Sequence, residues 1–156
     1  MNPDFKNCLD KKKLYRSEAA KALAGKEFSS ARYDLGEAEL SHSQKRYKWA
    51  TIQAYYAMFH AARALLYSRG YRERSHYCVA AGIEHLFGGT RQLDLKWVRA
   101  LMNAMSLRED ADYSDVYSPE GAKVSVMNAK GFVREAGRLL KDSGKIGKKS
   151  PTVPPA

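Results

Sequence analysis

The chain has 156 residues and a formal net charge of +10, a basic excess that attracts either phosphate backbones or an acidic protein surface without choosing between them. A single domain of this length buries about two-thirds of its unfolded surface, so no metal or disulfide is needed to hold it together. The longest charge-free run of the most extended helical pattern, Trp49 to Ala62, has fourteen residues, which excludes a membrane-spanning helix there.

The two cysteines, Cys8 and Cys78, each lie within a helical pattern and show no CxxC or Cys/His spacing. We therefore expect free thiols in a reducing compartment, which predicts a cytoplasmic protein. The first residues, MNPDFKNCLDKKK, lack an apolar signal core and agree with that location. The sequence predicts no metal site and no cofactor.

Apolar residues recur at three- and four-residue steps along most of the chain and predict six helical segments. In order these cover roughly Pro3–Ala24, Glu27–Leu40, Tyr47–Gly70, Ser75–Gly88, Leu93–Ser106 and Pro119–Asp142. Gly25 marks the end of the first, and no stretch of more than a few residues is typical of a strand. The short links predict an all-α, up-and-down bundle of five to six helices over residues 1–143. Residues 144–156 form a basic, proline-containing tail that we expect to be disordered.

The segment from Tyr47 to Gly70 is the longest helical pattern, and we expect it to be central, packed against the first, second and last helices. At about 100° per residue it has one wholly apolar face, made of Tyr55, Met58, Phe59, Ala62, Leu65 and Leu66. A second face, here called the polar stripe, consists of Gln53, Tyr56, His60, Arg63 and Tyr67. Two interpretations stay open: the stripe forms an interface or ligand groove, or it covers the edge of the core.

Three motifs follow one another before a long, alanine-bearing last helix: AYYAMFHAARALLYSRGY, then SHYCV, then LREDADY. Together they resemble the HEPN superfamily of helical-bundle proteins (higher eukaryotes and prokaryotes nucleotide-binding), in particular its small single-domain branch. The likeness covers roughly Ala31 to Leu140. It implies a bundle of about five helices, a homodimer, and a minimal nucleotidyltransferase as partner in a prokaryotic toxin–antitoxin pair. Many members of the superfamily are metal-independent ribonucleases.

Ribonucleases of this family carry an arginine, a polar residue, three to five further residues and a histidine just before the last helix. Such a histidine can move the proton of a ribose 2′-hydroxyl while the arginine stabilises charge on the phosphate, so no metal is required. The matching stretch here begins at Arg108 and has Asp112 at the histidine position, followed by Tyr113. An aspartate of ordinary pKa is a poor proton shuttle near neutrality. The structural alternative for Arg108 and Asp112 is an ion pair that closes a helix end.

The residues and the resemblance together favour a HEPN-like binding protein, the helical partner of a minimal nucleotidyltransferase, that binds nucleotide or RNA. Its candidate binding residues are Tyr56, Arg63, Arg108, Asp112 and Tyr113. One alternative is a metal-independent ribonuclease toxin with a rearranged site, for which the candidate catalytic residues are His60, His76 and Arg108. The other is a structural bundle whose basic charge maintains solubility, so the sequence leaves enzymatic activity open.

Overall fold

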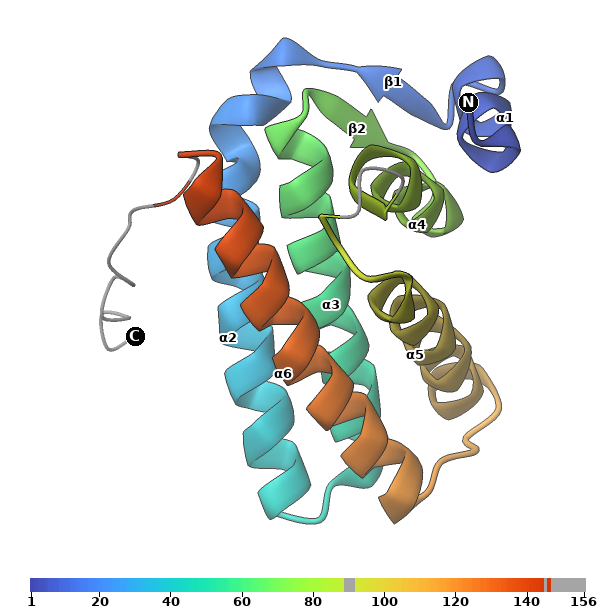
Figure 1. The fold of residues 1–156 in the computed structure, drawn as a ribbon. Coiled ribbons are helices and arrows are strands. Elements are labelled where there is room, and N and C mark those ends of the chain that lie inside the picture. The colour runs from blue at the N-terminus through green and yellow to red at the C-terminus, as the bar shows by residue number, and fades with distance from the viewer. Residues whose placement is uncertain (89–91, 145, 147–156) are drawn as a thin grey trace.

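The computed structural model describes residues 1–88, 92–144 and 146. Its elements are α1 (Pro3–Asp10), β1 (Leu14–Arg16), the 3-10 helix η1 (Glu18–Leu23), α2 (Ala24–Ser43), α3 (Tyr47–Ser68), β2 (Tyr71–Glu73), α4 (His76–Ile83), the π-helical turn η2 (Glu84–Gly88), α5 (Leu95–Tyr113) and α6 (Pro119–Asp142). Helices α2, α3 and α6 run side by side, and α4 and α5 lie on the other side of α3 (Figure 1). The predicted all-α bundle is confirmed. The predicted disordered tail lies outside the described residues, apart from residues 144 and 146.

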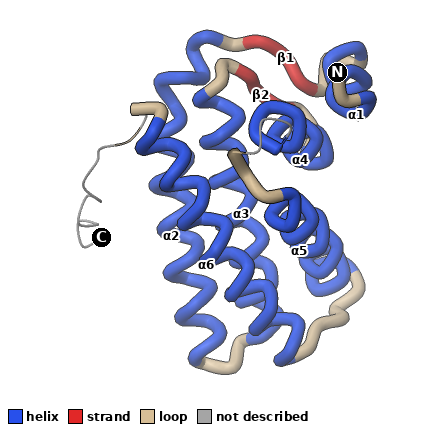
Figure 2. The backbone as a smooth tube through the Cα atoms, viewed as in Figure 1, coloured by secondary structure: helices blue, strands red, loops and turns tan. Residues whose placement is uncertain are grey.

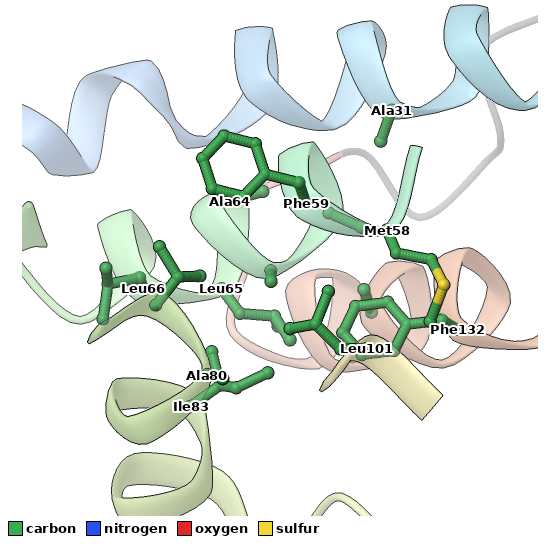
Figure 3. Close-up of a cluster of buried hydrophobic side chains, with 14 of the residues drawn as sticks. Ala31, Met58, Phe59, Ala64, Leu65, Leu66, Ala80, Ile83, Leu101 and Phe132 are labelled. Carbon is green, nitrogen blue, oxygen red and sulfur yellow. The ribbon is translucent and has the colours of Figure 1, made fainter. Parts of the chain in front are cut away.

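Helix α3 is the centre of the bundle, as predicted, because α2, α4, α5 and α6 all pack against it. Its buried residues include six alanines, Ala50, Ala54, Ala57, Ala61, Ala62 and Ala64. These small side chains let the neighbouring helices approach closely, while Met58 and Leu65 fill the space beside Leu101 and Phe132 (Figure 3). Among the described residues, no helix combines the length and the apolar character needed to cross a membrane.

The first predicted helix, Pro3–Ala24, is wrong. Helix α1 ends at Asp10, and Lys12 then adopts a left-handed backbone conformation with φ of 55°, which a right-handed helix cannot contain. Strand β1 follows and pairs antiparallel with β2, placing Tyr15 opposite Arg72 (Figure 2). Gly25 is not a helix stop either, because α2 begins one residue before it. As a result η1 packs on α3, whereas α1 packs on α4.

The prediction of two free thiols is also wrong, because Cys8 and Cys78 form a disulfide that joins α1 to α4, with 5.9 Å between their Cα atoms. Two features of the fold bring these segments together. Strands β1 and β2 pair, and the ring of Phe5 stacks on that of His85 with centroids 4.1 Å apart. Neither contact is visible in the spacing of the cysteines, which are 70 residues apart. The argument from free thiols to a reducing compartment therefore does not hold.

Candidate functional site

The polar stripe of α3 does not face a single neighbour, and only part of it faces the last turns of α5 around Asp112. Its neighbours come from both sides: α2 and β2 supply carboxylates near His60 and Arg63, while the first residue of α4, His76, and the last turns of α5 lie near Tyr56. Figure 1 shows α2 on one side of α3 and α4 and α5 on the other, with β2 following the end of α3. The stripe is therefore divided into a carboxylate-rich half and an aromatic half.

His60 is held between two carboxylates of α2. Its Nδ1 lies 2.8 Å from Glu27 Oε2 and its Nε2 lies 3.6 Å from Asp34 Oδ2. Burial raises the pKa of Asp34, and burial alone would raise that of Glu27 too, but the hydrogen bond with His60 and the charge of Arg63 outweigh it and lower the Glu27 pKa. With both ring nitrogens facing carboxylates, His60 is placed to bridge α2 and α3 rather than to exchange a proton with a substrate.

Arg63 occupies the centre of the carboxylate-rich half. Its Nε lies 2.6 Å from Glu73 Oε1, one guanidinium nitrogen lies 3.6 Å from Glu27, and the other donates a hydrogen bond to the Tyr67 hydroxyl. The Glu73 side chain is only 5% exposed, and burial raises its pKa even though Arg63 opposes that effect. Removing one partner of so buried a pair leaves an uncompensated charge. Arg63 is thus a structural cation that ties α3 to α2 and β2.

His76 opens α4 and belongs to the aromatic half. Its Nδ1 lies 2.9 Å from the hydroxyl of buried Tyr55, and its ring packs on that of Phe59 with centroids 4.1 Å apart. The His76 pKa is lowered first by burial of part of the ring and then by the positive charges of Arg108 and Arg63. The imidazole is therefore neutral near pH 7, and His76 as a whole is an exposed residue.

Arg108 lies in an aromatic frame at the last turns of α5. Its guanidinium donates a hydrogen bond of 2.7 Å to the Tyr56 hydroxyl and lies 5.3 and 5.4 Å from the ring centroids of Tyr56 and Tyr113. It also lies 3.5 Å from Asp112, four residues along the same helix. The stretch that contains them was predicted to follow the fifth helix after Ser106, but α5 continues to Tyr113 and carries this stretch on its last turns.

The structure brings some of the predicted residues together and separates others. Tyr56, Arg108, Asp112 and Tyr113 are in mutual contact through Arg108, and His76 joins them through Tyr55, whose ring lies 5.7 Å from the Arg108 guanidinium. His60 and Arg63 belong to the carboxylate-rich half instead.

Sequence reasoning missed several members of the site. It named neither of the two main carboxylate partners of Arg63, Glu27 and Glu73, because they lie on a different helix and on a strand that was not predicted. It also assigned Tyr55 to the apolar face, where its ring does lie, although its hydroxyl reaches His76. Two sequence features could have indicated this contact: the adjacent tyrosines Tyr55 and Tyr56, and the histidine at the start of the following helix, His76. Within the described ranges no group of three or more histidine, cysteine, aspartate or glutamate residues is arranged to hold a metal ion.

Comparison with known proteins places this geometry in a family. Residues 26–146 match the model of the HEPN domain. The chain is 30% identical over 117 residues to a protein of Methanocaldococcus jannaschii named "Putative toxin MJ0605", an alignment that covers 72% of this chain and 84% of that protein. It is 26% identical over 114 residues to a UPF0332 protein of Thermotoga maritima, covering 72% of this chain and 86% of that protein. The match spans all five helices of the bundle, α2 to α6, and the chain belongs to the HEPN domain family.

Proposed function

We propose that this HEPN protein has a toxin-like function and binds RNA through Tyr56, His76, Arg108 and Tyr113, here called the Arg108 cluster. The observation that carries the proposal is the contrast between the two arginines. Arg63 is held by a carboxylate that is 5% exposed, whereas the Asp112 carboxylate near Arg108 is 37% exposed and 3.5 Å away. The Arg108 side chain is itself only 12% exposed, so the open side of this pair is the Asp112 carboxylate, and that is the position that a phosphate can take beside the Arg108 guanidinium.

The surroundings of Arg108 suit a nucleic acid better than a small carboxylate. Tyr113 is 74% exposed at the end of α5, and its ring offers a face on which an unpaired base can stack. The Tyr56 hydroxyl fixes one side of the guanidinium and leaves less of its conformational freedom to be lost on binding. The net charge of +10 adds a sequence-independent attraction to the phosphate backbone. The similarity to the protein named "Putative toxin MJ0605" supports the toxin-like part of the proposal.

A second candidate, metal-independent RNA cleavage, is favoured by one observation. His76 has a lowered pKa and its Nδ1 lies next to the Tyr55 hydroxyl, so Nε2 is the ring nitrogen that we assign to the reaction. In that reaction Nε2 accepts the proton of the ribose 2′-hydroxyl, whose oxygen attacks phosphorus. The 5′-oxygen then leaves with a proton from solvent or from the imidazolium, and Arg108 stabilises the charged phosphorane. This path uses His76 in place of the histidine that the family motif has where this chain has Asp112.

RNA binding can be tested by fluorescence anisotropy with a labelled single-stranded RNA at 150 mM salt. We expect Arg108→Gln to weaken binding by roughly tenfold or more, since hydrogen bonds to a charged group contribute about 1.5–3 kcal/mol. Asp112→Asn should strengthen it, because it removes the competing carboxylate. The matched control is Arg99→Gln, an exposed position on the same helix with the same change of charge. Equal losses for Arg108→Gln and Arg99→Gln would reduce the interaction to bulk charge and refute the site.

Cleavage is tested separately with the same RNA in the presence of a chelator. A His76→Gln variant should fail to cleave RNA but still bind it, more weakly than the wild type, through Tyr56, Arg108 and Tyr113. If a variant altered at His60, His76 and Arg108 still cleaves RNA at the wild-type rate without metal, this cleavage mechanism is excluded. The RNA-binding proposal is judged separately, by the anisotropy measurement.

The homodimer and the minimal nucleotidyltransferase partner are also part of this proposal, and they rest on membership of the HEPN family. The toxin-like function implies a protein that restrains it, and the nucleotidyltransferase is the candidate. Light scattering of the purified chain, alone and after co-expression with such an enzyme, measures both. A monomer that does not change on co-expression would contradict the two assignments.

A further inference from the structure

A groove with a basic rim lies between α2 and α6, on residues that the Arg108 cluster does not use. It encloses about 630 Å³. Its floor is apolar and is formed by Phe28, Leu35, Val133 and Ile146. Its rim carries five cations, Arg32, Lys130, Arg134, Arg138 and Lys141, against a single acidic side chain, Glu39. An apolar floor surrounded by side chains of almost entirely positive charge indicates a binding surface, whereas an ordinary solvated helix face carries scattered charges of both signs.

Two glycines keep this groove open. A Cβ atom added at Gly36 would meet nothing within 4 Å, so the backbone of α2 is uncovered at the groove. Glycine is also a poor helix former, and almost any other residue except proline would stabilise the helix more at this position. On the opposite wall, Gly137 lies against the ring of Phe28, and an added Cβ would come within 2.9 Å of that ring. Gly137 thus allows α2 and α6 to pack closely, and Gly36 leaves the space above them unfilled.

We propose that the α2–α6 groove is a docking site for an acidic amphipathic helix of a partner protein. The partner's apolar side chains would cover Leu35 and Ile146, the two floor residues that are only partly buried, and its carboxylates would meet the rim. The wall from Lys130 to Lys141 extends about 16 Å at 1.5 Å per residue, the length of roughly three turns of a docked helix. Arg138 already pairs with Glu135 at 2.8 Å and with Asp142 at 3.8 Å, and these exposed contacts can be shared with or replaced by a partner carboxylate.

Other occupants fit the groove less well. The basic rim could attract the phosphates of RNA, but the floor is mainly aliphatic. Its one aromatic ring, that of Phe28, is 7% exposed and packed on Gly137, so bases have little surface on which to stack. The chain's own residues beyond 146 include Lys148 and Lys149, whose charge matches that of the rim. A second copy of the chain also has a net charge of +10, so its overall charge does not complement this basic rim.

The test uses the full chain and a synthetic 14-residue helical peptide with leucines at i, i+3, i+4 spacing and glutamates elsewhere. The comparison peptide has every glutamate replaced by lysine. Binding is measured for the wild type, for Lys130→Gln/Arg134→Gln, for Gly36→Met, which fills the groove, and for Gly36→Ala, which leaves it open. We expect the acidic peptide to bind the wild type and Gly36→Ala equally, and the other two variants at least fivefold more weakly. Thermal melts check that all four are folded.

In the peptide assay, any of three outcomes would overturn the proposal: equal binding of the acidic and basic peptides, equal binding of the acidic peptide by all four proteins, or its displacement by a peptide of residues 145–156. Single-stranded RNA is the remaining probe. We expect Lys130→Gln/Arg134→Gln to keep its RNA affinity within about threefold, since the Arg108 cluster is intact. If Lys130→Gln/Arg134→Gln loses RNA binding and keeps peptide binding, the groove is part of an RNA-binding surface and the protein-docking proposal is wrong. This conclusion does not depend on the RNA affinity of Arg108→Gln, which tests the Arg108 cluster.

Discussion

Replacing both cysteines, Cys8→Ala/Cys78→Ala, removes the one covalent link between α1 and α4 that the described residues contain. The disulfide closes a loop between residues 70 apart in the sequence. The chain-entropy relation gives about 4 kcal/mol at 25 °C for a loop of that length, because the link restricts the unfolded chain. For a chain of this size, about 4 kcal/mol corresponds to a fall in melting temperature of roughly 10 °C. Alanine is used because both sites are buried and a serine hydroxyl would have to be satisfied there.

The assay is differential scanning calorimetry of the wild type and the double variant, each with and without dithiothreitol. We expect the reductant to lower the melting temperature of the wild type towards that of the variant and to leave the variant unchanged. Titration of thiols in unfolded, unreduced wild type should find none. Two titratable thiols per chain, or a wild-type melting temperature that does not respond to the reductant, would refute the reasoning and restore the expectation of free cysteines.

Two further predictions concern packing and protonation. Gly131→Ala should lower the free energy of unfolding in urea by about 1–3 kcal/mol, because the added Cβ overlaps the ring of Trp97. Gly36→Ala should raise it by about 0.5–1 kcal/mol, because the added Cβ meets nothing and alanine favours the helix. Equal effects of the two changes would contradict the close contact between Gly131 and Trp97. The His76 imidazole should titrate by NMR below its ordinary pKa of 6.5, and Arg108→Gln should raise the midpoint by removing a positive charge. Since the folded state then binds fewer protons than the unfolded chain, this group's contribution to stability falls as pH drops through 6.5 towards the folded pKa. A wild-type midpoint at or above 6.5 would show that the ring is not in the environment described.

Local signals predicted most of the bundle. The bounds of α6 agree with the prediction, since Ser118 accepts a hydrogen bond from the Gly121 backbone and Pro119 takes the first helical position. Helix α3 was found from its apolar face, and α2 was found although it begins earlier and ends later than predicted. The end of α5 was placed too early because acidic residues were taken as a link. These are features that neighbouring residues in the chain determine.

The features that were not predicted depend on contacts between residues that are distant in the sequence, and no local sequence pattern indicates such contacts. Each of the two strands has three residues and exists only because the other lies beside it. The same pairing brings Glu73 to Arg63, so one of the two arginines predicted to bind a ligand is paired with a buried carboxylate. The aromatic half of the site was closer to prediction because Arg108, Asp112 and Tyr113 adjoin in sequence and share the last turns of one helix.

The burial of α3 has a consequence for how selective an RNA site beside it can be. Because helices enclose α3, Tyr55 and Tyr56 are fixed to a backbone that cannot rearrange unless the core opens, and His76 and Arg108 are hydrogen-bonded to them. If RNA binds there as we propose, the protein is ordered very little, and the entropy lost on association falls mainly on the RNA. An RNA loop that already presents an unpaired base should then bind more tightly than a flexible strand of the same sequence. Preference among RNAs would follow their stiffness as much as their bases.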